Sequence, residues 1–191
     1  MSIIMAAGNC DEVIIMSDGR WSGEGPNGER IVIDEDFKKI TKLHDKLYIA
    51  FAGHVDDCCS VIKGVSKILS ESTSVEQYTS AIMNWIQENV DYEHTDFNAQ
   101  IIVTGCNSFG KLKINAVRCY DHNLSSERNN LDNVGRFTVC SALDPTDDFV
   151  TPIMQQGKPL VEQMVEVVKE ASKRDQTVND HIFYEVLTAN S

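Results

Sequence analysis

The side chains in this sequence that are best suited to metal binding or nucleophilic chemistry are six cysteines and five histidines. No two cysteines have the C-x-x-C spacing, and no cysteine and histidine share the spacing of a zinc site. His94, close to Glu93 and Asp96, is more typical of a polar loop than of a ligand set. We therefore predict no metal and no cofactor, and reduced thiols that pack as small hydrophobic groups. The cysteines are Cys10, Cys58, Cys59, Cys106, Cys119 and Cys140.

The charge balance and the apolar runs narrow the classes of partner and compartment. A formal net charge of −12 repels phosphate backbones and anionic lipid, so nucleic acid and membrane surfaces are excluded as expected partners. No apolar run approaches the roughly 18 residues that span a bilayer. The first seven residues lack a basic segment and acidic residues follow at once, so we expect neither a signal peptide nor a propeptide, and a cytoplasmic protein.

Short apolar runs separated by turn residues predict that the first part of the chain is rich in strands. Residues 2–7 and 12–17 flank the turn-forming segment 8–11 and are typical of a hairpin. Residues 21–30 are rich in glycine and contain Pro26, which favours a loop or the tip of a long hairpin. Further strands are predicted at residues 31–33, 39–43 and 47–52.

The pattern then changes to apolar residues three or four apart, which predicts two helices. The first follows Val55 to Leu69, and the second begins at a capping box formed by Ser74 and Gln77. The rest of the chain alternates again. Its predicted elements are strands at 99–104, 111–119 and 136–141, a helix opened by Asp144-Pro145 and bent or broken at Pro152, a helix at 160–172, and a strand at 182–187.

This order of elements predicts an α+β protein, with residues 1–191 forming a single domain. Strands joined by hairpins run antiparallel. Helix pairs inserted between groups of strands suit two stacked antiparallel sheets, each covered by its own helix layer.

Three local segments are more specific than the order of elements. They are Ser17-Asp-Gly-Arg-Trp-Ser22; then Phe37-Lys-Lys-Ile-Thr-Lys-Leu43, with Ile49-Ala-Phe-Ala-Gly53 after it; and Ala171-Ser-Lys-Arg-Asp175 before the final strand. In these segments the chain resembles the proteasome β subunits and the related bacterial ATP-dependent protease subunit. In that family an acidic residue lies sixteen positions after the nucleophile, as Asp18 lies sixteen after Ser2.

The resemblance implies the four-layer αββα sandwich of the N-terminal-nucleophile (Ntn) hydrolases. In this class the first residue of the processed chain is the nucleophile, which here would be Ser2 after removal of Met1. A serine hydroxyl needs a base, and the free α-amine, with an ordinary pKa of about 7.7–8.0, can be that base. Lys39 takes the place of the family's catalytic lysine and would tune both groups. Asp18 would hold Lys39 in place.

The same resemblance implies supporting and substrate-binding residues. Ser141 corresponds to the serine of the family's glycine–serine–glycine turn, and Asp175 to an aspartate that supports the nucleophile. The backbone N–H of Ala50, where the family has glycine, would donate to an oxyanion. Ser22 would pair with the substrate backbone by strand addition. Trp21 and Tyr48 would line the substrate pocket.

Several departures from the family pattern keep a second interpretation open. Cys140 and Ala142 replace the two glycines of the turn, and Val178 replaces the serine of the family's Asp-x-x-Ser. Thr177 or Asn179 could supply the hydrogen bond that Val178 cannot. The alternative to a peptidase or amidase is therefore a catalytically silent relative that serves as an assembly or binding module. A third hypothesis makes Cys140, near Ser2, a redox-sensitive group.

Each chemical residue also has an ordinary structural explanation. A serine commonly follows an initiator methionine, Asp18-Gly19 alone is a turn signal, and Lys38-Lys39 is typical of a solvated strand edge. The resemblance further implies a homo-oligomeric ring, a peptide or small amide substrate, and an ATPase unfoldase as a candidate partner. The loop between Asp18 and Lys39 exceeds the family's spacing by about five residues, and its composition fits an insertion.

Overall fold

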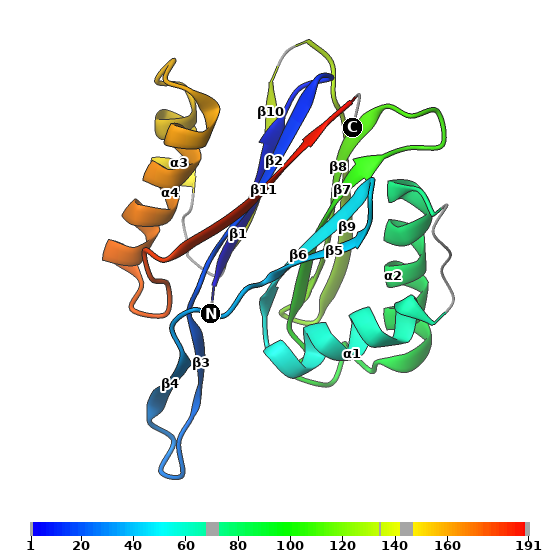
Figure 1. Ribbon diagram of the computed structural model, residues 1–191. Helices are drawn as coiled ribbons and strands as arrows, with labels where there is room; N and C mark the ends of the chain where they lie inside the picture. Colours follow the sequence, from blue (N-terminus) through cyan, green and yellow to red (C-terminus); the bar gives the residue numbers. More distant parts are fainter. Residues whose placement is uncertain (1, 68–72, 134, 142–146, 190–191) are drawn as a thin grey trace.

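The structure is a computed structural model that describes residues 2–67, 73–133, 135–141 and 147–189. Two antiparallel sheets lie face to face, and each carries a pair of helices on its outer side (Figure 1). This is the predicted four-layer αββα sandwich. In the described part of the chain, no helix combines the length and the apolar character needed to cross a bilayer.

The first sheet contains the first and the last strand of the chain and has the strand order β10-β1-β2-β11. The predicted hairpin of the first two strands is confirmed, with Met5 opposite Met16. Both of these strands are buried on both faces, which explains why they are nearly continuous apolar runs. Its strands are β1 (Ile3–Gly8), β2 (Glu12–Asp18), β10 (Arg136–Ser141) and β11 (Ile182–Thr188).

The second sheet has the order β5-β6-β7-β8-β9. Its last strand was not predicted, because Asn-Leu-Ser-Ser-Glu-Arg-Asn-Asn carries little apolar alternation. Backbone pairing with β8 nevertheless runs along its whole length. Asp121 and His122 form the tight turn with φ of 49° and 58°, a conformation more often signalled by Asn-Gly. The strands are β5 (Ile40–His44), β6 (Leu47–Gly53), β7 (Ala99–Cys106), β8 (Leu112–Tyr120) and β9 (Asn123–Asn130).

A small two-stranded sheet, β3 (Trp21–Glu24) with β4 (Arg30–Asp34), occupies the long segment between Asp18 and Lys39. Figure 1 shows this hairpin projecting from the body of the molecule. Every residue of β4 is exposed. The glycine-rich stretch is therefore the tip of a long hairpin, which was one of the two predicted possibilities.

The helices are α1 (Val55–Ser66), α2 (Val75–Asn89), α3 (Asp147–Met154) and α4 (Leu160–Arg174). The predicted capping box is present: Gln77 N–H donates to Ser74 Oγ at 3.4 Å, and Ser74 N–H donates to Gln77 Oε1 at 2.8 Å. Helix α3 continues two residues beyond Pro152 before it ends. The predicted opening of that helix at Asp144-Pro145 lies outside the described residues.

Three apolar clusters bind the four layers together. One joins α1 and α2 to the second sheet, and another joins α3 and α4 to the first sheet. The third fills the space between the sheets and contains Ile4, Ala50 and Ile102. Alternate residues of β1 therefore serve different clusters, since Ile3 faces the helices and Ile4 faces the second sheet.

Truncating a side chain in the middle cluster should test this packing. Ile102 is fully buried, so Ile102→Ala should lower the free energy of unfolding by about 2–5 kcal/mol through lost contacts and a residual cavity. Urea denaturation measures the change. Phe109→Ser, at a side chain that is 85% exposed, is the control and should change stability by less than about 0.5 kcal/mol. Equal effects of the two substitutions would contradict the assigned core.

Candidate active site

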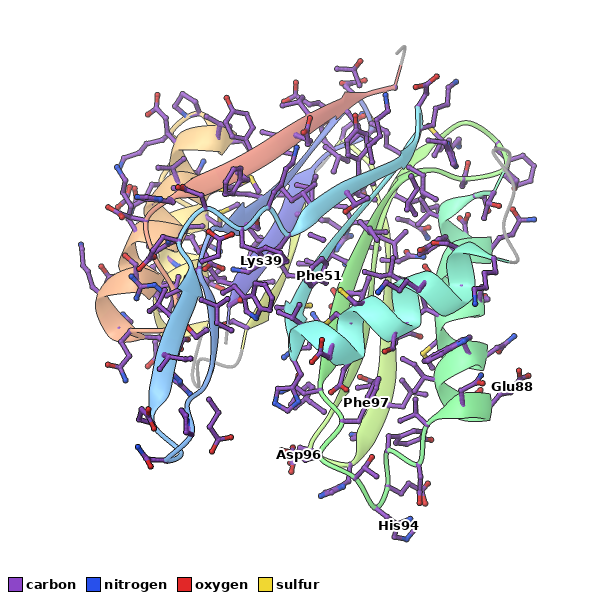
Figure 2. The ribbon with its side chains drawn as sticks, turned by 60° about the horizontal axis from the view of Figure 1, so that its bottom comes forward. Lys39, Phe51, Glu88, His94, Asp96 and Phe97 are labelled. Carbon is purple, nitrogen blue, oxygen red and sulfur yellow. The ribbon has the colours of Figure 1, made fainter. Side chains whose placement is uncertain are left out.

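Asp18 and Lys39 form a buried ion pair between the end of β2 and the start of β5. Lys39 Nζ lies 2.8 Å from Asp18 Oδ1, and the two side chains are 1% and 0% exposed. The same ammonium also donates to the Asp18 carbonyl oxygen at 3.2 Å. Figure 2 shows Lys39 in the region between the two sheets, near Phe51. The predicted pairing of these two residues is thus present in the structure.

The Asp18 carboxylate also connects this pair to the beginning of the chain. Its Oδ1 accepts the backbone N–H of Ile3 at 3.0 Å, and its Oδ2 accepts the backbone N–H of Arg20 at 2.9 Å. One oxygen atom therefore contacts both the lysine ammonium and the peptide that joins Ser2 to Ile3. The backbone N–H of Ile3, the residue after Ser2, and the Lys39 ammonium thus share one acceptor.

The environment of Lys39 lowers the pKa of its side chain. Burial lowers the pKa of the Lys39 ammonium below its ordinary value of 10.5, while the Asp18 carboxylate acts in the opposite direction and Arg20 adds a smaller lowering effect. Removing a charge from water is costly, and the close carboxylate offsets part of that cost. Lys38, the preceding residue, is instead half-exposed and pairs with Glu185 on the surface.

Ser2 precedes β1 and is 7% exposed. Alternation along the strand places it on the same face as Ile4, which packs between the sheets. Ser141 lies across from Ile3 on β10, and Cys140 lies across from Ile4. The chain start and the segment predicted to flank it are therefore neighbours. Ala142 lies outside the described residues.

Cys140 is a packing residue of the middle cluster and 1% exposed. Burial raises the pKa of its thiol to about 11, although Arg118 acts to lower it. Because the thiolate is the form that oxidises readily, such a thiol is a poor redox sensor. The geometry gives no support to the redox hypothesis for this residue.

Asp175 follows α4 and uses its carboxylate locally. Its Oδ1 accepts the backbone N–H of Thr177 at 2.7 Å, which fixes the turn between α4 and β11. Val178, where the family has a serine, is buried in the helix–sheet cluster. The neighbouring Thr177 is fully buried, and its Oγ1 has no hydrogen-bond partner among the described residues.

A second polar group beside the ion pair was not recognised in the sequence. Arg20 Nε and Nη2 each lie 3.0 Å from the Glu35 carboxylate, in a two-pronged contact. Asn179 donates to the Glu35 carbonyl oxygen and to Glu35 Oε2, both at 2.8 Å. The Asn179 side chain also accepts the N–H of Gly19 at 2.9 Å. We call these three residues, Arg20, Glu35 and Asn179, the hairpin clasp.

A cavity of about 610 Å³ opens along the β3–β4 hairpin, from Ser22 to Gly28 in its tip. Its lining comes from β3, the hairpin tip and the start of β4, from the end of β6 and the start of α1, and from the turn after α4. Ser22, predicted to bind substrate backbone, lines this cavity, and its buried Oγ has no partner in the described part of the chain. The lining residues are Ser22, Gly23, Glu24, Gly28, Arg30, Gly53, His54, Val55 and Gln176.

Ala50 lies in the interior of the second sheet, paired with Ile40 and Ile102. The N–H of Phe51 donates to Lys39 on the β5 side, whereas the N–H of His54 donates to Asn98 on the β7 side. Because successive N–H groups point to opposite edges of a strand, the N–H of Ala50 points toward β7. The N–H of Gly53 points toward the β5 side of the strand, beyond Ile40, where β5 begins, and Gly53 lines the cavity.

Trp21 and Tyr48, the two aromatic residues predicted to line the substrate pocket, pack in different parts of the structure. Trp21 contacts Phe37 with ring centroids 5.0 Å apart, and Phe37 in turn meets Phe51 edge-on at 6.1 Å. Tyr48 packs at the margin of the middle cluster, near the other end of β6. Neither Trp21 nor Tyr48 is among the residues that line the cavity beside the hairpin.

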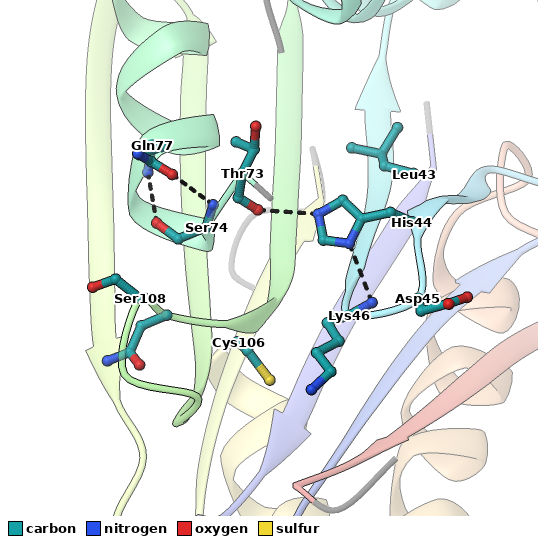
Figure 3. A pocket seen from close by; sticks show the side chains of 10 residues that line it. Leu43, His44, Asp45, Lys46, Thr73, Ser74, Gln77, Cys106 and Ser108 are labelled. Carbon is teal, nitrogen blue, oxygen red and sulfur yellow. Dashed lines mark hydrogen bonds between the residues drawn. The ribbon is translucent and has the colours of Figure 1, made fainter. Parts of the chain in front are cut away.

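A larger cavity of about 670 Å³ lies at the far end of β5, away from the ion pair. Figure 3 shows His44 in this cavity, hydrogen-bonded to the Thr73 carbonyl oxygen and opposite the capping box of α2. None of the residues predicted to be catalytic lines it. Volume alone therefore does not identify the site. In the described part of the chain no group of three or more His, Cys, Asp or Glu residues could hold a metal ion.

Two stacked antiparallel sheets between helix layers, with a buried aspartate–lysine pair against the first strand, define the fold class of the Ntn hydrolases. The family described as Proteasome subunit matches residues 2–120, which is more than half of the 191 residues. The chain belongs to the proteasome subunit family. This membership relates it in general terms to the Ntn-type peptidases.

The structure is similar to the crystal structure of eukaryotic HslV from Trypanosoma brucei. The TM-score is 0.69 and the sequence identity 18%, over 97% of this chain and 99% of that chain. At this identity the likeness concerns the fold. No protein with a curated description matches the sequence.

Removing the negative charge of the ion pair should be strongly destabilising. Asp18→Asn would leave the Lys39 ammonium buried without a counter-charge, at a cost of about 3–5 kcal/mol, measured by urea denaturation at pH 7. The matched control is Asp45→Asn, because Asp45 pairs with Lys42 at 2.9 Å but is 93% exposed. That control should leave the free energy of unfolding close to the wild-type value. Similar losses in both variants would contradict the assignment of a special buried pair.

Proposed function

We propose that this protein is an Ntn-type peptidase or amidase in which Ser2, exposed by removal of Met1, is the nucleophile. The observation that carries the proposal is the shared oxygen of Asp18, which contacts Lys39 Nζ at 2.8 Å and the Ile3 N–H at 3.0 Å. A single oxygen atom therefore contacts both the Lys39 ammonium and the backbone N–H of the residue after Ser2. Family membership supports the reaction class.

The reaction would proceed in two stages that share one base. The free α-amine of Ser2 takes the proton of its own hydroxyl, and Oγ attacks the substrate carbonyl carbon. The amine then gives that proton to the leaving nitrogen, the C–N bond breaks, and an ester on Ser2 remains. A water molecule, deprotonated by the same amine, hydrolyses the ester and restores Ser2.

Lys39 and Asp18 would set the electrostatics of these steps. A nearby ammonium opposes protonation of the α-amine and stabilises negative charge on Oγ. Asp18 keeps that ammonium charged and fixed within the low-dielectric space between the sheets. Ser141 and Asp175 would act as supporting residues at the margin, and the buried Thr177 hydroxyl is the better replacement for the hydroxyl that Val178 lacks.

For the oxyanion donor we propose the backbone N–H of Gly53 rather than that of Ala50. Strand register points the Ala50 N–H into the sheet, whereas Gly53 lines the cavity. Gly53 also has φ of +112°, and a Cβ there would lie 2.4 Å from the Asn98 carbonyl oxygen. A glycine is therefore required at the position where the chain turns toward the site.

An extended peptide is the substrate that the cavity fits best. Strand β3 forms one wall, and its Ser22 hydroxyl is available for a hydrogen bond to substrate backbone. A peptide lying along β3 would extend the small sheet by strand addition. From the family we also propose that the protein assembles into a homo-oligomeric ring and that an ATPase unfoldase delivers substrates to it.

One observation favours the alternative of a catalytically silent assembly or binding module. Val178 and Cys140 are both buried packing residues, so two positions that carry polar or flexible groups in the family serve the core here. The mass of the intact chain purified from cells distinguishes the two functions. Retention of Met1 would block the α-amine and favour the silent module, whereas its loss favours the peptidase.

Ser2→Ala should abolish turnover of a fluorogenic peptide without loss of fold, because the acyl-enzyme could not form. Turnover and thermal unfolding would be measured on the same preparations. Ser125→Ala on the exposed strand β9 is the matched control and should keep the wild-type rate. An unchanged rate in Ser2→Ala would refute the assignment of the nucleophile.

The pH profile should report Lys39. If the ammonium is required, kcat/KM must fall as pH rises through the pKa of Lys39, which burial places below 10.5. The acid limb should reflect the α-amine, which must be neutral to act as base. Lys39→Arg should lower the rate but remove the alkaline limb, since arginine stays protonated up to about pH 12. An alkaline limb that persists unchanged in this variant would show that it arises from another group.

A further inference from the structure

The turn that carries Asp18 is held from outside by the hairpin clasp. Asp18, Gly19 and Arg20 leave β2 in a segment whose N–H groups at Gly19 and Arg20 have different acceptors. The Arg20 N–H orients the Asp18 carboxylate through Oδ2. The Gly19 N–H between them is bound by the side chain of Asn179, which is 160 residues away in the chain.

The contacts of Asn179 are directional and enclosed. Its side chain uses Oδ1 for Gly19 and Nδ2 for two oxygens of Glu35. Asn179 is only 5% exposed, so water has little access to replace these bonds. Arg20 completes the circuit, since its guanidinium binds the Glu35 carboxylate and also donates to the Gln176 carbonyl oxygen.

Close packing around this turn leaves no room for a side chain at Gly19. A Cβ at Gly19 would lie 2.8 Å from the Glu35 carbonyl oxygen, the same atom that Asn179 binds. The base of the hairpin and the turn after α4 are therefore locked to the backbone of the Asp18 turn. Gln176, held by Arg20, also lines the cavity beside the hairpin.

We propose that Asn179 is a positioning residue for the Asp18–Lys39 pair, acting through Gly19 and Glu35; this inference rests on the proposed peptidase function. Asn179 sets the Gly19 peptide, which fixes the Arg20 N–H against Oδ2 and leaves Oδ1 for Lys39 and Ile3. Val178 cannot hold the Gly19 peptide because its side chain has no polar group. The Asp175 carboxylate is already engaged, since it accepts the N–H of Thr177.

Loss of the clasp should change the electrostatics of Lys39 in a defined direction. The charged groups that act on the Lys39 ammonium are Asp18, which raises its pKa, and Arg20, which lowers it. If Asp18 loses its fixed orientation, its stabilising effect on the ammonium weakens while burial remains. The pKa of Lys39 should then fall further below its ordinary value.

The direct experiment is a titration of Lys39 by NMR, with the lysine side chains labelled and the Lys39 signal assigned by Lys39→Arg. In Asn179→Ala the titration of Lys39 should move to lower pH than in the wild-type protein. The matched control is Asn107→Ala, because Asn107 also accepts backbone N–H groups in a turn, at Phe109 and Lys111, but far from the site. An unmoved Lys39 titration in folded Asn179→Ala would overturn the proposal.

A second experiment measures the kinetics of Asn179 variants and of a double variant that exchanges the donor and the acceptor between positions 35 and 179. Asn179→Ala should lower kcat about tenfold, the usual scale for the loss of an outer partner of a functional group, with little change in KM. Asn179→Asp keeps an acceptor for Gly19 but opposes the Glu35 carboxylate, and should impair the enzyme. Adding Glu35→Gln restores a donor between positions 35 and 179, so the double variant should recover activity relative to Asn179→Asp. Failure of this recovery, or a loss confined to thermal stability, would contradict positioning.

The two arms separate this inference from the proposed function. If the wild-type protein shows no turnover, the peptidase proposal fails, yet the NMR titration still measures whether Asn179 controls the Lys39 environment. If turnover depends on Ser2 but the titration of Lys39 is the same in Asn179→Ala as in the wild-type protein, only the positioning role of Asn179 is refuted.

Discussion

The structure depends on a pair of opposite charges that has been moved out of water. Lys39 and Asp18 are almost completely buried at 2.8 Å, and each is costly in that environment without the other. Their contact joins the two sheets at the end where the chain begins. The N–H of Arg20 satisfies the other carboxylate oxygen, and Lys39 itself also donates to the Asp18 carbonyl oxygen. The stability of the fold and the proposed reactivity of Ser2 therefore depend on the same interaction.

Much of the architecture could be predicted from the sequence because local patterns and tertiary packing agree. The buried strands β1 and β2 are apolar on both faces, and the capping box of Ser74 and Gln77 marks the start of α2. Strand β9 was not predicted because it forms by backbone pairing at the edge of the second sheet, where the side-chain pattern carries little information. Its turn uses Asp121-His122 instead of the residues that normally signal such a conformation.

The candidate site was predictable only in part. Spacing and family resemblance pointed to Asp18 and Lys39, but nothing in Lys38-Lys39 reveals which lysine is buried; that follows from strand alternation once β5 is in place. The choice of Gly53 over Ala50 as the proposed oxyanion donor required the register of β6. The hairpin clasp could not be foreseen, because Glu35 and Asn179 meet only after the final turn docks beside the hairpin.

The exposed strand β4 has a consequence for colloidal behaviour. Ile31, Val32 and Ile33 are 42–49% exposed on a strand whose outer edge is unpaired in the described part of the chain, and such edges tend to stick to one another. Acidic neighbours, including Glu24, Glu29 and Asp34, surround this aliphatic run and act as gatekeepers through like-charge repulsion. The net charge of the chain falls to zero near pH 4.7, so repulsion between whole molecules is weakest there, and the exposed aliphatic run of β4 is then least protected against association.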